Sequence, residues 1–575
     1  MKKRWIIYPI REALRDQISQ SFEISRVSAQ ILINRGLDNV DVVQKFLNLN
    51  LNNLYDPFIL EGITQAVERI LLAVKRKETV LIHGDYDVDG ITSTAIMYVI
   101  LRSVGVPVYY YIPNRLVEGY GLGEEGIQAA LNHGASLVIT VDCGINAVNE
   151  VNRLKANGID VIITDHHVSS GDLPDAWSVV NPNLPERNYP FKELAGVGVC
   201  FKLLHALLKK ARQDKLTLFD HVDLREHLDL VALGTIADMM PLVDENRVFV
   251  LYGLRQLSNT SKIGLQKLKE KTAIPQNRPM KTTDVSFFIA PRINAIGRLK
   301  EADLAVELMI TDDPAEAQYL TDMMEKVNRE RQKLEEEVFL QAKDMIENTP
   351  EIRDRKILLV AKRDWAVGIV SIVAARLTRE YFKPAIVFTI GDDNIARGSA
   401  RSVTCFNLLD GLSKCDELLL EYGGHSFAAG LSLKAENIDA LTKRINAIAD
   451  AELINNELLP EVYIDYTINL ADIGDQLMKE TEMLAPFGQK NSRPVFLSEN
   501  LMVQGIPRFF GRNHVKFIVE DDGIIQEVIG FNMQEDLRDL SKGDIVDIVY
   551  SLHLTEYTGI PTIQLQILDA RIHKN

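Results

Sequence analysis

Residues 80–90 read Val-Leu-Ile-His-Gly-Asp-Tyr-Asp-Val-Asp-Gly, and the interpretation of the whole chain starts from this stretch. A short apolar run leads into one histidine and three aspartates at alternate positions, namely His83, Asp85, Asp87 and Asp89. In an extended backbone these four side chains project to one side. Crowded carboxylates repel one another, and burial of an ionised carboxylate is costly unless a cation compensates it. The stretch therefore predicts a site for divalent metal.

The residues that follow alternate between short apolar runs and helical patterns. Strands are expected at 79–83, 108–112, 137–141 and 160–164, with helices at 92–104, 124–133 and 147–157 between them. This alternation predicts βαβ units and a buried parallel sheet. In such sheets, ligands bind outside the carboxyl ends of the strands.

Polar side chains follow three of these strands at the carboxyl end. The first strand is followed by the three aspartates, the third by Asp142, and the fourth by Asp165, His166 and His167. Each cluster alone is compatible with a helix cap or a surface position, but three in one βαβ series indicate a single site.

The ligand types at this edge indicate the metal and the chemistry. In a straight strand Asp85 and Asp89 would be roughly 13 Å apart, so the aspartates could share one ion only if the chain curls, which Gly84 and Gly90 permit. Two ions about 3.5–4 Å apart suit the set better. Carboxylates mixed with imidazoles favour Mn²⁺, with Mg²⁺ as a substitute, over zinc. A pair of such ions supports hydrolysis of phosphate esters or anhydrides by a metal-bound hydroxide nucleophile.

Length, composition and charge indicate the general class of protein. The chain has 575 residues, 46% hydrophobic and 25% charged, which predicts a soluble protein with more than one domain. Four cysteines without a CxxC pair, no bilayer-length apolar run and no signal-peptide core predict a cytoplasmic protein without membrane contact. The net charge of −16 argues against uniform electrostatic binding to nucleic acid, although it allows a local basic groove.

Several motifs resemble a known superfamily. The segments 85–90, 141–144 (Val-Asp-Cys-Gly), 165–167 (Asp-His-His) and 234–241 (Gly-Thr-Ile-Ala-Asp-Met-Met-Pro) resemble the four motifs of the DHH phosphoesterases. Further segments, at 34–36, 112–122, 290–298 and 423–430, resemble the RecJ family of single-strand-specific exonucleases. The resemblance covers essentially the whole chain. It implies a metal-dependent 5′-to-3′ exonuclease that hydrolyses single-stranded DNA in repair and recombination.

The resemblance also implies roles for individual residues. The implied metal ligands are His83, Asp87, Asp89, Asp142, His166 and Asp238. Among these, Asp142 bridges two ions, and Asp238 is selected by the resemblance alone. Asp142 and His166 are also implied in catalysis, together with Asp85, which supports the ligands or orients water, and His167, which faces the scissile phosphate.

A wider set is expected to contact nucleic acid: Arg115, Tyr120, Arg292, Asn294, Arg298, Arg376, Arg397, Ser399, Arg401, Gly423, Gly424, His425, Phe509, Arg512 and Lys516. Between Arg355 and Arg401, nine Lys and Arg stand against four Asp and Glu, a local charge of +5. Backbone N–H groups that are accessible at glycines can bind phosphate together with neighbouring guanidinium groups. Two alternatives stay open: each arginine could instead pair with acidic neighbours, and Phe509 or Phe510 could be a buried barrel residue.

The expected domains are a helical lead-in (1–60), a parallel-sheet catalytic domain (61–310), a connecting helix (311–350), a smaller α/β substrate-binding domain (351–455) and a β-barrel (456–575). Residues 314–348 contain no glycine and no internal proline, which predicts one long helix or two broken ones. Short strands with turn signals after residue 461 predict the barrel, and the resemblance implies that it is an OB-fold that binds single strands.

A single strand is expected to thread between the two α/β domains. A duplex would be too wide for such a channel, so strand specificity would be steric. The resemblance further implies a monomer whose partners are a single-strand-binding protein and a RecQ-type helicase. Three other functions stay open: a phosphoesterase for small molecules such as pyrophosphate, a binding protein on a decayed nuclease scaffold, and a nuclease that prefers RNA.

Overall fold

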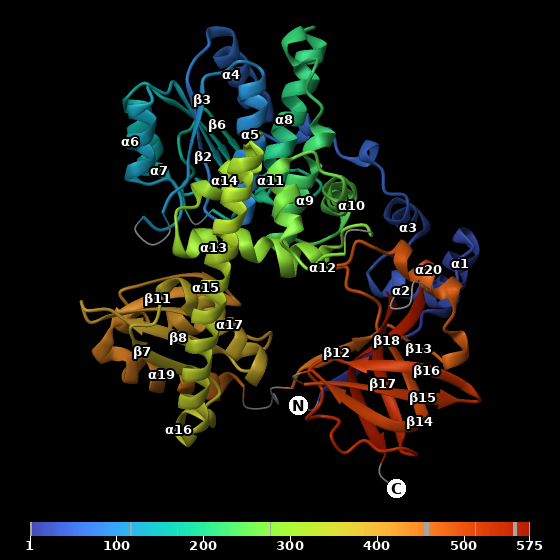
Figure 1. Cartoon of the computed structure of the whole chain (residues 1–575). Coiled ribbons are helices and arrows are strands. Elements are labelled where there is room, and N and C mark those ends of the chain that lie inside the picture. Colours follow the sequence, from blue (N-terminus) through green and yellow to red (C-terminus); the bar gives the residue numbers. More distant parts are fainter. Residues whose placement is uncertain are drawn as a thin grey trace. The chain divides into compact units, whose positions relative to one another are not determined.

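The computed structural model describes residues 3–114, 118–169, 171–275, 278–453, 459–511, 513–555 and 561–573 (Figure 1). Two predicted nucleic-acid contacts, Arg115 and Arg512, lie outside these residues. The chain forms two compact units. One comprises residues 56–238 and 253–459, and the other comprises 1–55, 239–252 and 460–575. No described helix has both the length and the apolar character needed to cross a membrane.

A five-stranded parallel sheet organises the first unit, in the order β3-β2-β4-β5-β6. Its strands are β2 (Val80–His83), β3 (Val108–Tyr111), β4 (Leu137–Val141), β5 (Asp160–Thr164) and β6 (Ser178–Val180). The first four confirm the predicted strands. Strand β6 lies in a Pro- and Asn-rich segment without the long apolar run that marks a buried strand, so the sequence pattern did not predict it.

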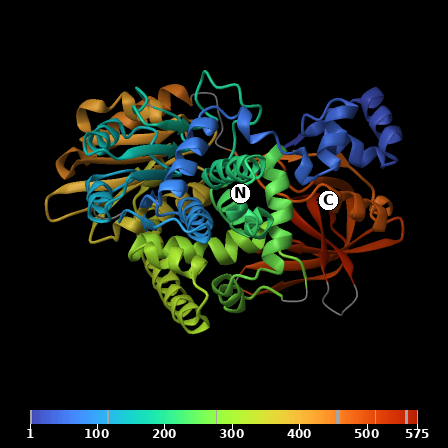
Figure 2. The same ribbon diagram turned by 90° about the horizontal axis from the view of Figure 1, so that it is seen from above.

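Helices cover both faces of this sheet, as Figures 1 and 2 show. On one face, α6 (Glu124–Asn132) and α7 (Val148–Ala156) bury a cluster that includes Leu81, Val138 and Ile163. On the other side lie α4 (Ile63–Arg76), α5 (Val88–Ser103) and α8 (Gly196–Gln213). The strands are apolar at nearly every position because both faces are buried.

The metal-site stretch does not stay extended. The strand ends at His83, and α5 already begins at Val88, so the four ionisable side chains do not project from one extended segment, and the chain curls between Gly84 and Gly90. The first turn of α5 packs directly on the preceding loop. A Cβ at Gly90 would lie 2.6 Å from the Asp85 Cα, so only glycine allows this curl.

Helices complete the sheet-bearing part of this unit: α9 (Leu228–Ala237), α11 (Ile263–Glu270), α12 (Thr282–Asp284), the π-helical turn η5 (Val285–Ile289), α13 (Ala290–Leu299) and α14 (Asp303–Ile310). A further helix, α10 (Asp244–Ser258), contains residues of both units. The predicted connecting helix is a single one, α15 (Pro314–Glu347).

A second sheet follows α15 in the same unit, with the order β10-β11-β9-β8-β7. Its strands are β7 (Leu358–Arg363), β8 (Ala385–Ile390), β9 (Ile395–Arg401), β10 (Glu421–His425) and β11 (Ala428–Lys434). Only β7 and β8 pair in parallel. The two helices on the sheet are α17 (Val367–Tyr381) and α19 (Ile438–Glu452). The sequence predicted β7 and β8 but not the glycine-rich strands β9 to β11, because glycine is depleted in typical strands.

The other unit contains the barrel. Strands β14 (Phe496–Phe510), β15 (His514–Asp521), β16 (Ile524–Gly530), β18 (Thr562–His573) and β17 (Ile545–Thr555) pair in that order. Pairing of β14 with β17 closes the ring and confirms the predicted five-stranded barrel. The lead-in was expected to be helical, and it does contain α1 (Glu12–Phe22), α2 (Arg26–Asn34) and α3 (Val40–Leu47). It begins, however, with strand β1 (Arg4–Ile7), which pairs with β12 (Glu461–Ile464).

Candidate metal centre

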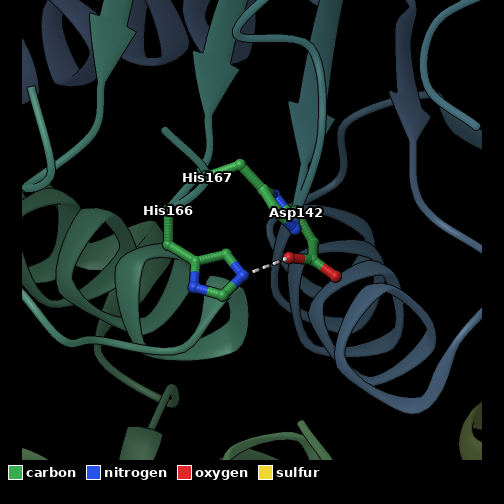
Figure 3. Close-up of side chains that lie close together, drawn as sticks. All are labelled: Asp142, His166 and His167. Atoms are coloured by element: carbon green, nitrogen blue, oxygen red, sulfur yellow. Dashed lines mark ion pairs between the residues drawn. The ribbon is translucent and has the colours of Figure 1, made fainter. Parts of the chain in front are cut away.

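The carboxyl ends of β2, β4 and β5 bring the predicted acidic and histidine side chains together. Three groups each place one ligand atom per residue within 4.8 Å of the others. They are Asp85, Asp87 and Asp142; Asp89, His166 and Asp238; and Asp142, His166 and His167. Figure 3 shows the His166 ring turned toward the Asp142 carboxylate, with Nε2 3.2 Å from Oδ1. Since Asp142 and His166 belong to two groups each, the three groups form one continuous cluster.

Two of these aspartates also act as helix caps, the role that each would have alone. Asp87 Oδ1 accepts hydrogen bonds from the backbone N–H groups of Asp89 and Gly90 at the start of α5. Asp89 accepts from the N–H groups of Gly196 and Val197 at the start of α8, at 2.7 and 2.8 Å. These bonds fix the two carboxylates and leave further oxygen lone pairs for a cation.

Asp142 sits at the end of β4 with a left-handed backbone, φ 62°. This conformation is uncommon for residues other than glycine, and such strain concentrates at functional sites. Its Oδ1 is buried and accepts no hydrogen bond from the described residues. A buried carboxylate oxygen in that state is a ready metal ligand.

The structure does not bring His83 into any of the three groups. Its ring Nε2 lies 3.1 Å from the carbonyl oxygen of Gly121, and the ring stacks on Tyr111. Asp85, which the sequence analysis gave a supporting role, instead stands in a group with Asp87 and Asp142. The physical reason is the curl after Gly84: His83 is still part of the strand, whereas Asp85 lies on the loop that bends toward β4.

The cluster has a strong excess of negative charge. Burial, followed by repulsion from neighbouring aspartates, raises the pKa of Asp89 to about 7, that of Asp238 to about 8, and that of Asp142 well above its usual range. All three carboxylates lie close to the same imidazole: His166 Nε2 is 4.0 Å from Asp89, 3.2 Å from Asp142 and 3.7 Å from Asp238. Burial also lowers the pKa of His166 to about 4, so this imidazole is neutral at physiological pH and can ligate a metal.

His167 is held differently from His166. Its Nδ1 lies 2.7 Å from Asp165 Oδ1 and 3.0 Å from the hydroxyl oxygen of Tyr120. Burial alone would lower the pKa of His167, but the Asp165 carboxylate outweighs it and raises the pKa to about 9. The Tyr120 hydroxyl also donates to the backbone carbonyl of Asp142, at 3.2 Å. Three motifs are thereby joined by side-chain hydrogen bonds.

The donor set fits hard divalent cations. It combines five carboxylates with imidazole nitrogens and contains no thiolate, since Cys143 is buried and its thiol lies 3.7 Å from the His83 carbonyl oxygen. Carboxylate-rich sites with imidazole suit Mn²⁺, and carboxylate sites suit Mg²⁺. The crowding of buried aspartates is explained if cations neutralise them.

A second feature lies on the mixed sheet. A hollow of about 840 Å³ is lined by residues that include the predicted Arg397, Ser399, Arg401, Gly423 and Gly424. Arg401 Nη1 is 2.9 Å from Ser399 Oγ. Two other predicted contacts do not line it. His425 is exposed at the end of β10, whereas Arg376 pairs with Glu336 and lies over the Phe339 ring.

The arginines of α13 are engaged with protein groups. Arg292 Nε pairs with Glu325 Oε2 at 2.8 Å, and its Nη1 donates to the carbonyl of Phe288. Arg298 Nη1 donates to the carbonyl of Gly368 and to Ser371 Oγ, both at 3.0 Å. For Arg292 and Arg376, and also for Arg397, which pairs with Asp393 at 2.8 Å, the structure therefore shows the acidic pairing that the sequence left open. Asn294 is half-buried on the same helix.

On the barrel, Phe509 and Phe510 are 42% and 40% exposed, so neither is a buried barrel residue. Lys516 pairs with Glu527 at 2.7 Å. Asp165 has a positioning role that was not predicted from the sequence. The signal was present: an aspartate directly before two histidines can accept their backbone N–H groups, as Asp165 does here.

Comparison with known proteins identifies three family models. The DHH family, N-terminal domain, matches residues 79–235, the DHHA1 domain matches 354–451, and the RecJ OB domain matches 464–569. The single-stranded-DNA-specific exonuclease RecJ of Bacillus subtilis (strain 168) is 38% identical over 574 residues, which cover 99% of this chain and 71% of that protein. The enzyme of the same name from Escherichia coli (strain K12) is 33% identical, covering 88% and 90%.

Two solved structures of RecJ are also similar to this chain. The crystal structure of RecJ in complex with Mn²⁺ from Thermus thermophilus superposes with a TM-score of 0.84 at 28% identity, covering all of this chain and 80% of that one. The Mg²⁺ complex from the same organism gives a TM-score of 0.77 at 27% identity, covering 100% and 79%.

Proposed function

The chain belongs to the RecJ family of single-stranded-DNA-specific exonucleases, and from this membership we propose that it hydrolyses single-stranded DNA with divalent metal ions. The proposal includes 5′-to-3′ polarity and a role in DNA repair and recombination. The observation that carries it is the cluster of five aspartates and two histidines at one sheet edge, most of them buried, whose crowded carboxylates divalent cations would neutralise.

We assign two ions to this cluster, with Mn²⁺ favoured over Mg²⁺. Asp85, Asp87 and Asp142 would hold one, and Asp89, His166 and Asp238 the other. Asp142 is the candidate bridge because its carboxylate also lies 3.2 Å from His166. This assignment replaces His83 with Asp85. When bound, a pair of divalent ions polarises the phosphoryl group and activates water for attack on it.

The protein groups around the ions would handle orientation and proton transfer. Asp165 binds the Nδ1–H of His167 and favours its imidazolium form. The His167 Nε2–H would then contact the scissile phosphate and protonate the leaving oxygen. The Tyr120 hydroxyl, held between Asp142 and His167, would keep both at a fixed separation.

The hollow on the mixed sheet would bind substrate phosphate. Arg397 and Arg401 supply guanidinium groups, and Gly423 and Gly424 allow the backbone to approach closely. A hollow lined in this way suits a polyanion better than pyrophosphate alone. The barrel, with Phe509 exposed, would add a stacking surface for bases.

The proposal extends to the cellular setting. An exonuclease for unpaired strands depends on proteins that open duplex and cover the product. We therefore include a RecQ-type helicase and a single-strand-binding protein as partners of a cytoplasmic monomer. Size-exclusion chromatography with light scattering and binding assays with each purified partner test these points.

The decisive experiment offers purified protein and Mn²⁺ four end-labelled or colorimetric substrates: single-stranded DNA, duplex DNA, RNA and pyrophosphate. We expect release of mononucleotides from the 5′ end of single-stranded DNA, and little or no release from the duplex. Asp142→Ala should abolish it, whereas Asp220→Ala, an exposed aspartate of the same unit, should not. Hydrolysis of pyrophosphate alone, or activity that survives Asp142→Ala, would refute the proposal.

A further inference from the structure

An exposed aromatic side chain belongs to a segment that packs on two helices of the metal centre. Phe287 is 71% exposed and belongs to the π-helical turn η5. Phenylalanine carries a large apolar surface that water solvates poorly. Single π-turns within helices occur frequently at functional sites. The position of this turn and the way it is held both indicate a role.

The turn and the helix after it lie against elements that carry the cluster. η5 packs on α9, and Asp238 follows the last residue of that helix. At the other end, α13 packs on α5, and a Cβ at Gly297 would lie 2.6 Å from the carbonyl oxygen of Tyr86, between Asp85 and Asp87. The segment that presents Phe287 therefore packs on α9, which Asp238 follows, and on α5, which contains Asp89.

Polar contacts fix the turn on both sides. Before it, Arg278 binds the Asp284 carboxylate through two hydrogen bonds of 2.7 Å, and Asp284 also accepts from the Lys281 N–H. After it, Arg292 donates to the Phe288 carbonyl at 2.6 Å while pairing with Glu325 of α15. Arg292 thus binds a backbone carbonyl of the turn itself. A rigidly held aromatic ring loses little conformational entropy when a ligand stacks on it.

The charge of the segment indicates an anionic ligand. From Arg278 to Arg298 there are four Lys and Arg and one Asp, and Glu325 of α15 pairs with Arg292, so an excess of two positive charges remains. An exposed ring in a positively charged stretch is the arrangement that binds unpaired bases by stacking while cations meet the phosphates. A base inside a duplex has both faces covered by its neighbours and cannot stack in this way.

We propose that Phe287 is a stacking platform for a nucleobase of the single strand whose backbone enters the metal centre. Arg292 is the positioning residue that holds this platform in place. This inference rests on the proposed function and adds a contact that selects unpaired bases. Its loss weakens binding of the strand without altering the groups that carry out hydrolysis.

The test compares Phe287→Ala, Phe287→Leu and Phe287→Trp with the unaltered protein, all in EDTA so that the strand is bound and not cut. Fluorescence anisotropy measures the Kd for oligothymidylate and for an oligomer of equal length made of abasic residues. Stacking on one aromatic ring accounts for about 5- to 150-fold in affinity. We expect Phe287→Ala to raise the Kd for oligothymidylate within this range, Phe287→Leu to restore part of the affinity, and Phe287→Trp to restore all of it.

Two comparisons make the result specific. The abasic oligomer should bind the unaltered protein and Phe287→Ala equally. Tyr319→Ala removes another exposed aromatic side chain, on α15, and should leave both affinities unchanged. With Mn²⁺, Phe287→Ala should raise KM and leave kcat unchanged.

The outcomes separate the two proposals. Unchanged Kd in Phe287→Ala, or an equal rise for the abasic oligomer, overturns the stacking role while leaving the nuclease assignment intact. A protein that neither binds nor cuts oligothymidylate refutes both.

Discussion

Replacing Asp238 with asparagine should stabilise the metal-free protein and weaken its response to metal. Burial, and then repulsion from Asp89 and Asp87, raises the pKa of Asp238 from 3.8 to about 8 in the folded chain. At pH 7 the unfolded chain has this group ionised, so folding must either bind a proton or bury a charge. One pKa unit corresponds to 1.36 kcal/mol, which gives a cost of about 4 kcal/mol at pH 7.

The sign follows from linkage. Between pH 3.8 and about 8 the folded state binds more protons at Asp238 than the unfolded state, so stability from this group is lost as pH rises. Asparagine removes that loss. The Asp238→Asn variant should therefore unfold at a temperature several degrees higher than the unaltered protein at pH 7 in EDTA. The difference should shrink toward zero near pH 4.

Metal should narrow this difference in melting temperature between the two proteins. A cation at a concentration 100 times its Kd stabilises the folded state by about 2.7 kcal/mol, and Asp238→Asn lacks one proposed ligand. Thermal unfolding across pH, with EDTA or Mn²⁺, measures both effects. Equal melting temperatures in EDTA together with an undiminished Mn²⁺ response would refute the assignment of Asp238.

Asp165, which contacts His167 of the cluster, provides a control because its pKa shift has the opposite sign. Burial alone would raise the pKa of Asp165, but the hydrogen bond and charge of His167 outweigh it and the pKa is lowered. The stability that Asp165 contributes to the folded protein is present above pH 3.8. It is lost as the pH falls through the pKa of Asp165 in the folded chain, which is lower than 3.8. Asp165→Asn should therefore lower the melting temperature at pH 7, in EDTA and in Mn²⁺ alike.

Three further outcomes concern contacts around the cluster. Gly196→Ala would place a Cβ 2.7 Å from the Asp142 Cγ, so the affinity for Mn²⁺ should fall at least about 10-fold, as measured by calorimetry. Gly171 has open space around it, so Gly171→Ala is the control and should bind Mn²⁺ normally. His83→Gln should leave the number of bound Mn²⁺ ions unchanged by elemental analysis, and loss of one ion would restore His83 as a ligand. Tyr120→Phe removes a hydroxyl that contacts His167 and Asp142, and kcat should fall about 10-fold at unchanged Mn²⁺ affinity; an unchanged kcat contradicts the role of Tyr120.

The sheet that carries the metal centre was predictable because its strands are buried on both faces. Uniform apolar runs at 137–141 and 160–164 gave strands with the same bounds as β4 and β5. The parallel order then placed Asp142 and His166 at one edge, since parallel strands end on the same side. Strands β9 to β11 escaped prediction because glycines and short polar residues interrupt their apolar pattern.

The sequence by itself determined which residue types could form the centre, because ligand chemistry and strand ends are local properties. Tertiary structure alone decided which of them meet. His83 and Asp85 are two positions apart, yet the strand holds one against Gly121 while the loop turns the other toward Asp142. Asp238 joins from a helix more than 70 residues away from His166, and no local pattern encodes that approach. The reason is physical: a metal centre is built by the packing of distant segments, and the direction of each side chain depends on backbone turns that only the folded chain fixes.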